Sequence, residues 1–427
     1  MGVDEDTGRK AMETHARYKG KVDIGIKVPI KDLSDFNYIY TPGVAEPSRE
    51  IASSPESAYE LTNKGNSVAI LTDGSRILGL GNLGPAAALP VMEGKALLFK
   101  YLGGVDAFPL CVQARTTEEL ADVAKKVAPS FGGINMEDVE SPKCFEVYDL
   151  LIDSLDIPVF HDDRQGTATV VLAGLINSLK VVGKKLSQVS IVVVGAGAGG
   201  LASTRLLLRA GASGRNVVVC DSRGPLYEGR DHMDKYKNEV ARLTNAERLQ
   251  GTVETALRGV DVMICLSRPG PWIPKEWVAK MAGDAIVFAL ANPTPEIWPE
   301  DAIKGGARVV ATGRSDFPNQ INNSLAFPSI FRGMLEVRAR RVNDEMLIAA
   351  SKAIANWVEP RLGANRIVPT MDETEVFVKA AIAVANAAMD TGVARIKPPQ
   401  NELRAGIERK IHLVREKLSI LMERGLI

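Results

Sequence analysis

The sequence predicts an α/β fold in which a doubly wound parallel sheet follows a smaller α/β domain and precedes a set of helices. Strand-like and helix-like patterns alternate from residue 167 onward, which is typical of such a sheet. The apolar segment 189–194 suits a strand that is buried on both faces. At 427 residues the chain is too long for one ordinary core, so we expect more than one domain.

The patterns divide the chain into three parts. We expect an N-terminal substrate domain over 1–165, a sheet domain over 166–343, and a helical segment over 344–427 that packs back on the domains or on a partner subunit. The expected strands are at 68–71, 106–111, 157–160, 189–194, 217–220, 262–267, 285–291 and 309–311. The expected helices are at 91–102, 118–128, 168–182, 201–210 and 253–257. Apolar residues at spacings of three and four from 403 to 421 predict an amphipathic tail helix.

The composition argues against several classes of partner. Lysine plus arginine and aspartate plus glutamate number 52 each, so no net charge recruits nucleic acid or a membrane surface. The apolar runs are shorter than a membrane span, and the first ten residues lack the apolar core of a signal peptide. The four cysteines are widely spaced, as expected for reduced thiols. We therefore expect a cytoplasmic protein.

A glycine-rich turn directly follows the strand at 189–194 and opens a helix. It consists of Gly195, Ala196, Gly197, Ala198, Gly199 and Gly200. In the pattern G-x-G-x-x-G, the first glycine permits the tight turn, the second lets a pyrophosphate approach, and the third lets the helix pack closely. The helix N-terminus supplies N–H groups to the phosphates. Strand, turn and helix together predict a Rossmann-type site for a dinucleotide.

Asp221 ends the next expected strand, 21 positions after Gly200, where an acid that binds the ribose of NAD belongs. Ser222 and Arg223 follow it, and an arginine here can accommodate the 2′-phosphate of NADP. Arg223 is equally well explained as a solvated loop charge. The sequence leaves the choice between NAD and NADP open.

Two acidic doublets form a candidate metal site. Asp162 and Asp163 follow the expected strand at 157–160, where neighbouring carboxylates are costly to desolvate without a cation. Glu137 and Asp138 form an earlier doublet that can converge on the same cation. Oxygen ligands suit a hard divalent ion such as Mg²⁺ or Mn²⁺. The alternative for the later doublet is a helix N-terminus, where aspartate caps the helix.

Three further residues are candidates for chemistry. Tyr40 precedes a Pro-Gly turn, Arg76 lies in a glycine-rich loop, and Lys95 stands near the start of an apolar helix. Taken alone, residues of these types are more commonly packed or solvated.

Taken together, these stretches resemble the malic enzymes, from about residue 18 to residue 388. The blocks that carry the resemblance are Tyr-Thr-Pro-Gly-Val-Ala (40–45), Thr-Asp-Gly-Ser-Arg-Ile-Leu-Gly-Leu-Gly (72–81), Asn-Met-Glu-Asp (135–138), His-Asp-Asp-Arg-Gln-Gly-Thr-Ala (161–168) and Ala-Asn-Pro-Thr (291–294). Five matches in the family's order are specific, whereas any one of them would be weak. The fourth block departs slightly from the family at Arg164, where other members carry varied residues. The length is similar to that of the shorter prokaryotic form.

The resemblance implies metal-dependent oxidation of malate with NAD or NADP, followed by decarboxylation to pyruvate and CO₂. By position, Lys95 matches the general base that takes the C2 hydroxyl proton, and Tyr40 matches the acid that protonates C3 of enolpyruvate. Asp162 matches an acid beside the metal and the cofactor, and Arg76 matches the residue that binds the substrate carboxylate. The remaining matches are Glu137, Asp138 and Asp163 as metal ligands, and Asn292 and Asn323 as amides that contact substrate and cofactor.

Lys95 must be neutral to accept a proton, so we expect desolvation and the adjacent cation to lower its pKa. We also expect a homodimer or homotetramer, with the amphipathic tail as one candidate contact. One alternative is a metal-independent dehydrogenase of the amino-acid type, which chelator-sensitive release of CO₂ from malate would exclude. The other is a non-catalytic NAD(P)-binding regulator, against which the presence of Tyr40, Lys95 and Asp163 argues.

Overall fold

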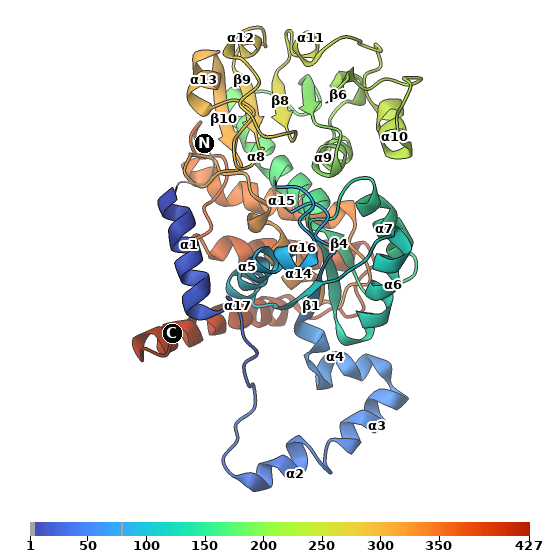
Figure 1. Cartoon of the computed structure of the whole chain (residues 1–427), viewed down its shortest axis with the longest axis vertical. Coiled ribbons are helices and arrows are strands. Elements are labelled where there is room, and N and C mark those ends of the chain that lie inside the picture. The colour runs from blue at the N-terminus through green and yellow to red at the C-terminus, as the bar shows by residue number, and fades with distance from the viewer. Residues whose placement is uncertain (1–4, 78–79) are drawn as a thin grey trace.

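The computed structural model describes residues 5–77 and 80–427, which contain two separate β-sheets flanked by helices (Figure 1). The first sheet has the strand order β2-β1-β3-β4, and the second has the order β10-β9-β8-β5-β6-β7. Nearly all neighbouring strands run parallel. The α/β class expected from the sequence is confirmed.

Four short parallel strands form the first sheet: β1 (Ser67–Thr72), β2 (Asp106–Cys111), β3 (Gly133–Met136) and β4 (Val159–His161). They are connected through helices α5 (Pro85–Gly103), α6 (Thr117–Val127) and α7 (Lys143–Ile152). β1 is buried along its whole length, as its apolar run requires. Because β3 and β4 are parallel neighbours, their carboxyl ends meet at one edge of the sheet.

The second sheet is doubly wound. Its parallel strands are β5 (Ile191–Val194), β6 (Val217–Asp221), β8 (Val262–Cys265), β9 (Ala285–Ala289) and β10 (Ala307–Thr312), and the short β7 (Gly224–Pro225) pairs antiparallel with β6. The helices of this half are α8 (Thr167–Val182), α9 (Ala198–Arg209), α10 (Lys235–Leu243), α11 (Val253–Ala256), α12 (Lys275–Val278) and α13 (Pro299–Lys304). The chain order reverses at β5, which lies between β6 and β8. Ligands of doubly wound sheets bind at the carboxyl ends of the strands beside such a reversal.

Helix α8 continues a π-helical turn over Asp162–Gly166 that follows β4. The combined segment Asp162–Val182 is long and apolar enough to cross a membrane, but 67% of its apolar window is buried within the protein. It packs against α9 and the C-terminal helix α15 (Asp344–Val358). Its apolar character therefore belongs to a core helix between the two sheets.

The remaining C-terminal helices pack back on the first sheet. They are α14 (Phe327–Glu336), α16 (Glu375–Asp390) and α17 (Gln400–Glu423). The ring of Phe99 on α5 lies 4.6 Å from that of Phe327 and 5.2 Å from that of Phe331, measured between centroids. The ring of Phe160 on β4 lies 5.5 Å from that of Phe331. The core of the first sheet is thus shared by segments far apart in the sequence.

The N-terminal segment forms an arm. After α1 (Glu5–Tyr18), it carries the short helices α2 (Phe36–Ile39), α3 (Ala45–Ser53) and α4 (Ala58–Leu61), none of which contains a buried residue. Figure 1 shows α2 and α3 projecting away from the body of the molecule. The arm therefore contributes little to the core of its own chain.

Candidate active site

Three carboxylates converge where β3 and β4 end. Glu137 and Asp138 directly follow β3, and Asp163 lies in the π-helical turn that follows β4. Ligand oxygens of these residues all lie within 4.8 Å of one another. The N–H of Asp138 donates to Oδ2 of Asp163 at 3.1 Å. The parallel pairing of two strands thus brings together two doublets that are distant in the sequence.

Lys95 reaches this cluster from helix α5. Its Nζ donates to Oε1 of Glu137 at 2.6 Å and also to Oδ2 of Asp162. The same nitrogen lies 4.5 Å from the centre of the Phe327 ring. Lys95 is 8% exposed and Asp162 is fully buried, so little water screens the interactions between them.

Burial and ion pairing act in opposite directions on these groups. Burial disfavours the charged form of Lys95, but the carboxylates of Asp162 and Glu137 outweigh it and raise the pKa of Lys95. Burial raises the pKa of Glu137 well above its usual value and that of Asp162 to about 6, although Lys95 opposes both shifts. The expected lowering of the Lys95 pKa assumes an adjacent cation and stays a prediction; without a cation, the two acids that surround the amine raise this pKa.

The loop that carries Arg76 is joined to the acidic cluster by its backbone. The N–H of Arg76 donates to the carbonyl oxygen of Asp138 at 3.0 Å. Asp138 has a φ of 50°, in the left-handed region that side chains rarely adopt. The Arg76 side chain is exposed. An exposed guanidinium beside the cluster can bind the carboxylate of an incoming ligand.

The two candidate amides lie on the side of the second sheet. Asn323 begins a 3-10 turn over Asn323–Leu325 and lies against the π-helical turn, since a Cβ added to Gly166 would be 3.3 Å from the Cβ of Asn323. Asn292 is exposed just beyond the carboxyl end of β9. Asn292 therefore lies at the carboxyl edge of the second sheet, whereas Asn323 lies against the turn that follows β4 of the first sheet.

The structure does not place Tyr40 beside Lys95 of the same chain. Tyr40 follows α2 on the arm and is 69% exposed. Figure 1 shows α2 at the far end of the arm, whereas α5, which carries Lys95, lies within the body. Within one chain, Tyr40 is therefore separate from the other candidate residues.

The glycine turn joins β5 to α9 as expected. Gly195 has a φ of 119°, and a Cβ there would collide with the carbonyl oxygen of Leu266. A Cβ on Gly200 would collide with the carbonyl oxygen of Gly195. A Cβ on Gly197 would meet no atom within 4 Å, so this face of the turn is open. The turn can accept a pyrophosphate at the N-terminus of α9.

Asp221 ends β6 beside this turn, where the N–H of Gly195 donates to the carbonyl oxygen of Cys220 at 2.8 Å. The carboxylate of Asp221 is paired with Arg230 and, at 3.3 Å, with Lys237. Neither basic residue was among the sequence candidates, because nothing in their spacing from Asp221 indicates contact.

Two buried polar residues beside the acidic cluster were also missed. Nδ2 of Asn135 donates to Oε2 of Glu137 at 3.0 Å. His161 is fully buried, with Nδ1 3.8 Å from Oδ2 of Asp163, and burial lowers its pKa to about 4. Asn135 and His161 each lie one or two positions before an acidic doublet, and this closeness in the sequence could have indicated that they lie beside the cluster.

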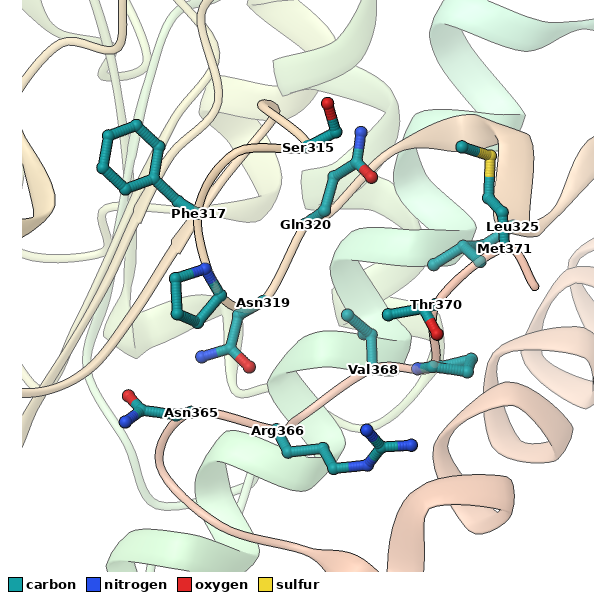
Figure 2. A pocket seen from close by; sticks show the side chains of 12 residues that line it. Ser315, Phe317, Asn319, Gln320, Leu325, Asn365, Arg366, Val368, Thr370 and Met371 are labelled. Atoms are coloured by element: carbon teal, nitrogen blue, oxygen red, sulfur yellow. The ribbon is translucent and has the colours of Figure 1, made fainter. Parts of the chain in front are cut away.

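A cavity of about 130 Å³ lies elsewhere, between the loop that follows β10 and the loop that precedes α16 (Figure 2). Its lining contains amides, hydroxyls, apolar side chains and the guanidinium of Arg366, but no carboxylate. Among them, Asn319 is engaged by its own fold, since its Nδ2 donates to the carbonyl oxygens of Val310 and Ala364 at 2.9 and 2.7 Å. This cavity has no chemistry in common with the acidic cluster.

Two family models match the chain. The model of the malic enzyme N-terminal domain matches residues 19–122, and that of the malic enzyme NAD binding domain matches residues 164–389. The chain belongs to the malic enzyme family. The first match contains Tyr40, Arg76 and Lys95, and the second contains the glycine turn, so one family accounts for these candidate residues and for the dinucleotide turn.

Known malic enzymes are similar to almost the whole chain. The bifunctional malic/malolactic enzyme of Bacillus subtilis (strain 168) is 48% identical over 409 residues, which are 95% of this chain and 99% of that protein. The crystal structure of the malic enzyme of Entamoeba histolytica has a TM-score of 0.96 at 41% identity and covers 99% of this chain and 89% of its own. The crystal structure of the malic enzyme from Pyrococcus horikoshii Ot3 has a TM-score of 0.93 at 48% identity and covers 98% of this chain and 99% of its own. Other relatives are named for dependence on NAD or on NADP.

Proposed function

We propose that this malic enzyme oxidises malate and decarboxylates it to pyruvate and CO₂, with a divalent metal ion and NAD or NADP. The observation that supports this most strongly is Lys95 held between Glu137 and Asp162, beside three converging carboxylates. Its small-molecule partners are malate and pyruvate. The reaction takes place in the cytoplasm, where thiols such as the four free cysteines stay reduced.

The acidic cluster fits Mg²⁺ or Mn²⁺. Glu137, Asp138 and Asp163 all offer hard oxygen ligands, and these lie within 4.8 Å of one another. Burial raises the pKa of Glu137 well above its usual value, and the neighbouring acids add to that shift, so the cluster favours added positive charge. When bound, such an ion supplies stabilisation of the negative charge that develops on the substrate as CO₂ leaves.

Different side chains around the cluster carry out the proton transfers and bind the substrate. A cation held by Glu137 would oppose the positive charge on Lys95, and the neutral amine then takes the proton of the C2 hydroxyl as C2 loses a hydride. Asp162 can then receive that proton from Lys95, because Nζ of Lys95 already donates to Oδ2 of Asp162. Burial also raises the pKa of Asp162 to about 6, which favours its protonated form. Arg76 binds a carboxylate of malate, and Asn292 and Asn323 orient substrate and nicotinamide.

Exposed apolar surface supports a homodimer in which Tyr40 serves the other protomer. On the arm, Ile24, Ile26 and Leu33 are 85%, 76% and 86% exposed. On the body, Leu97 and other apolar residues of α5 and α17 are also exposed, including Tyr101, Leu413, Ile420, Leu421 and Met422. Such surfaces are costly in water and mark contacts between proteins. The arm of each protomer covers the other, so that Tyr40 lies beside Lys95 of that protomer and protonates C3 of the enol.

The first test measures reduction of the cofactor by L-malate with Mn²⁺, before and after chelation. Chelation should abolish the rate and added Mn²⁺ should restore it. Lys95→Ala should lower kcat by about 10³-fold, the usual size of a general-base contribution. Lys100→Ala is the matched control on α5, because its side chain is 44% exposed and pairs with Asp106 outside the cluster. Turnover that resists chelation, or a wild-type rate in Lys95→Ala, would contradict the proposal.

A further inference from the structure

Three basic residues gather around Asp221 at the carboxyl end of β6. Arg230 contacts both carboxylate oxygens, with Nη1 donating to Oδ1 at 3.0 Å and Nη2 donating to Oδ2. Nζ of Lys237, on α10, donates to Oδ2 at 3.3 Å. Arg223 lies two positions after Asp221, and its backbone N–H donates to Oδ1 at 2.9 Å.

These contacts are built into the fold. The side chains of Asp221 and Arg230 are each 11% exposed, and that of Lys237 is 24% exposed. Nη1 of Arg230 also donates to the carbonyl oxygens of Gly224 and Pro225 at 3.1 and 3.2 Å, which fixes the guanidinium. Burial disfavours the charge on Asp221, but the bonds from Arg230 and from the Arg223 N–H hold its pKa below the usual value.

The acceptor capacity of Asp221 is already used. Its two oxygens accept four hydrogen bonds, two from Arg230, one from Lys237 and one from the Arg223 N–H. An ionised carboxylate offers about four acceptor sites. Asp221 therefore has no acceptor left for the ribose hydroxyls of NAD, which is the usual role of an acid at this position.

The charge around the same position is positive. The side chains of Arg223, Arg230 and Lys237 exceed the single carboxylate by two charges. The Arg223 guanidinium is exposed and, among the described residues, forms no ion pair. A phosphate monoester carries about −1.5 to −2 charges at neutral pH and accepts hydrogen bonds from arginine and lysine.

We propose that Arg223, Arg230 and Lys237 form a site for the 2′-phosphate of NADP, so that the enzyme selects NADP over NAD. The selection rests on the proposed function, since it concerns the cofactor of that reaction. The site lies beside the glycine turn, because the end of β6 is bonded to Gly195. Arg230 is the positioning residue, since it saturates Asp221 and removes the repulsion that a free carboxylate would exert on the phosphate.

The test measures binding of two adenosine fragments by isothermal titration calorimetry, without malate or metal. 2′,5′-ADP carries the 2′-phosphate and 5′-AMP lacks it. The folded wild type should bind 2′,5′-ADP at least about tenfold more tightly, as expected for two charge-assisted contacts. Lys237→Gln and Arg223→Gln should each reduce that preference about three- to tenfold. Arg230→Gln should reduce it further and strengthen binding of 5′-AMP, because it frees acceptor sites on Asp221.

The matched control is Lys235→Gln on the same helix, whose side chain is 66% exposed and pairs with Asp149. It should keep the wild-type preference. Absence of 2′,5′-ADP binding, equal or tighter binding of 5′-AMP, or an unchanged preference in both Lys237→Gln and Arg223→Gln would overturn the proposal. Because no turnover is required, selective binding of 2′,5′-ADP without decarboxylation of malate would contradict the proposed function and leave this site standing.

Discussion

Asp106, the first residue of β2, is held ionised by three donors on different segments. Lys100 pairs with it, Nδ2 of Asn66 donates to it at 2.9 Å, and Nζ of Lys27 donates at 3.1 Å. Burial opposes the charge, yet these contacts lower the pKa of Asp106 to about 2. The pKa in the folded state thus lies below the unfolded value of 3.8. The resulting stabilisation is complete above that unfolded value and is lost as the pH falls toward 2.

Asp106→Asn should therefore lower the free energy of unfolding at pH 7 by about 1 to 2 kcal/mol, less than the full shift allows because solvent screens part of the interaction. Urea unfolding at pH 7 and at pH 3 measures this, and the difference from the wild type should be smaller at pH 3. Asp122→Asn removes an exposed pair with Lys126 and should have a much smaller effect. An equal loss at both pH values would contradict the electrostatic explanation.

The sequence predicted most of the side chains of the candidate site but not the contacts between them. Glu137 and Asp163 could be placed together because each belongs to an acidic doublet and two such doublets can share one cation, although β3, which brings them together, was not predicted. The pairing of Lys95 with Asp162 could not be found, since it depends on how α5 lies against the sheet. The direction of the Lys95 pKa shift depends on that pairing, because the two acids raise the pKa when no cation is present; its lowering beside a bound cation stays a prediction.

Helices α7 and α10 form one of the contacts between the two halves of the molecule. The ring of Tyr236, on α10, is stacked on that of Phe145, on α7, with centroids 4.4 Å apart. The hydroxyl of Tyr236 donates to Oδ2 of Asp149 at 2.8 Å. Tyr236 is 5% exposed, so both its ring and its hydroxyl are used in this contact.

Tyr236→Ala should lower the free energy of unfolding by about 3 kcal/mol, because it leaves a cavity against Phe145. Tyr236→Phe keeps the ring and should cost about 1 kcal/mol for the lost hydrogen bond. Chemical denaturation of both variants measures the two contributions. If the alanine variant were no less stable than the phenylalanine variant, the stacked ring would not contribute to joining the halves.

The elements that sequence analysis predicted well are those with a strong apolar pattern, such as β1, β5 and α8. β3 was missed because it is short and its four residues include Gly133 and Asn135, so its strand form depends on pairing with β1 and β4. The helices of the arm were missed because they bury no residue and so show no apolar periodicity. β9 ends at Ala289, two residues earlier than expected.

At the scale of the whole molecule, the arm and the exposed faces of α5 and α17 determine the proposed dimer. The sequence could suggest the tail as a contact from its apolar spacing, but Leu403, Ile407 and Ile411 are buried in their own chain. Only the part of the helix toward its end leaves apolar residues exposed. That distinction requires the structure, because one amphipathic pattern fits both uses.

Co-expression of two inactive variants tests whether Tyr40 acts across the dimer. Tyr40→Phe and Lys95→Ala should each lack activity alone. Together they should recover about a quarter of the wild-type rate, because half of the dimers are mixed and each mixed dimer contains one intact site. Sedimentation analysis checks that both variants form dimers. A mixture that stays inactive while forming mixed dimers would mean that Tyr40 and Lys95 serve the same chain.

Release of labelled CO₂ from L-malate that carries ¹³C at C4 tests the proposed reaction most directly. Oxidation at C2 followed by decarboxylation should yield equal molar amounts of reduced cofactor and ¹³CO₂, and both should depend on Mn²⁺ and on Lys95. Reduced cofactor without ¹³CO₂ would indicate a simple dehydrogenase, and ¹³CO₂ without reduced cofactor would indicate decarboxylation without net oxidation. Either result would contradict the proposed oxidative decarboxylation.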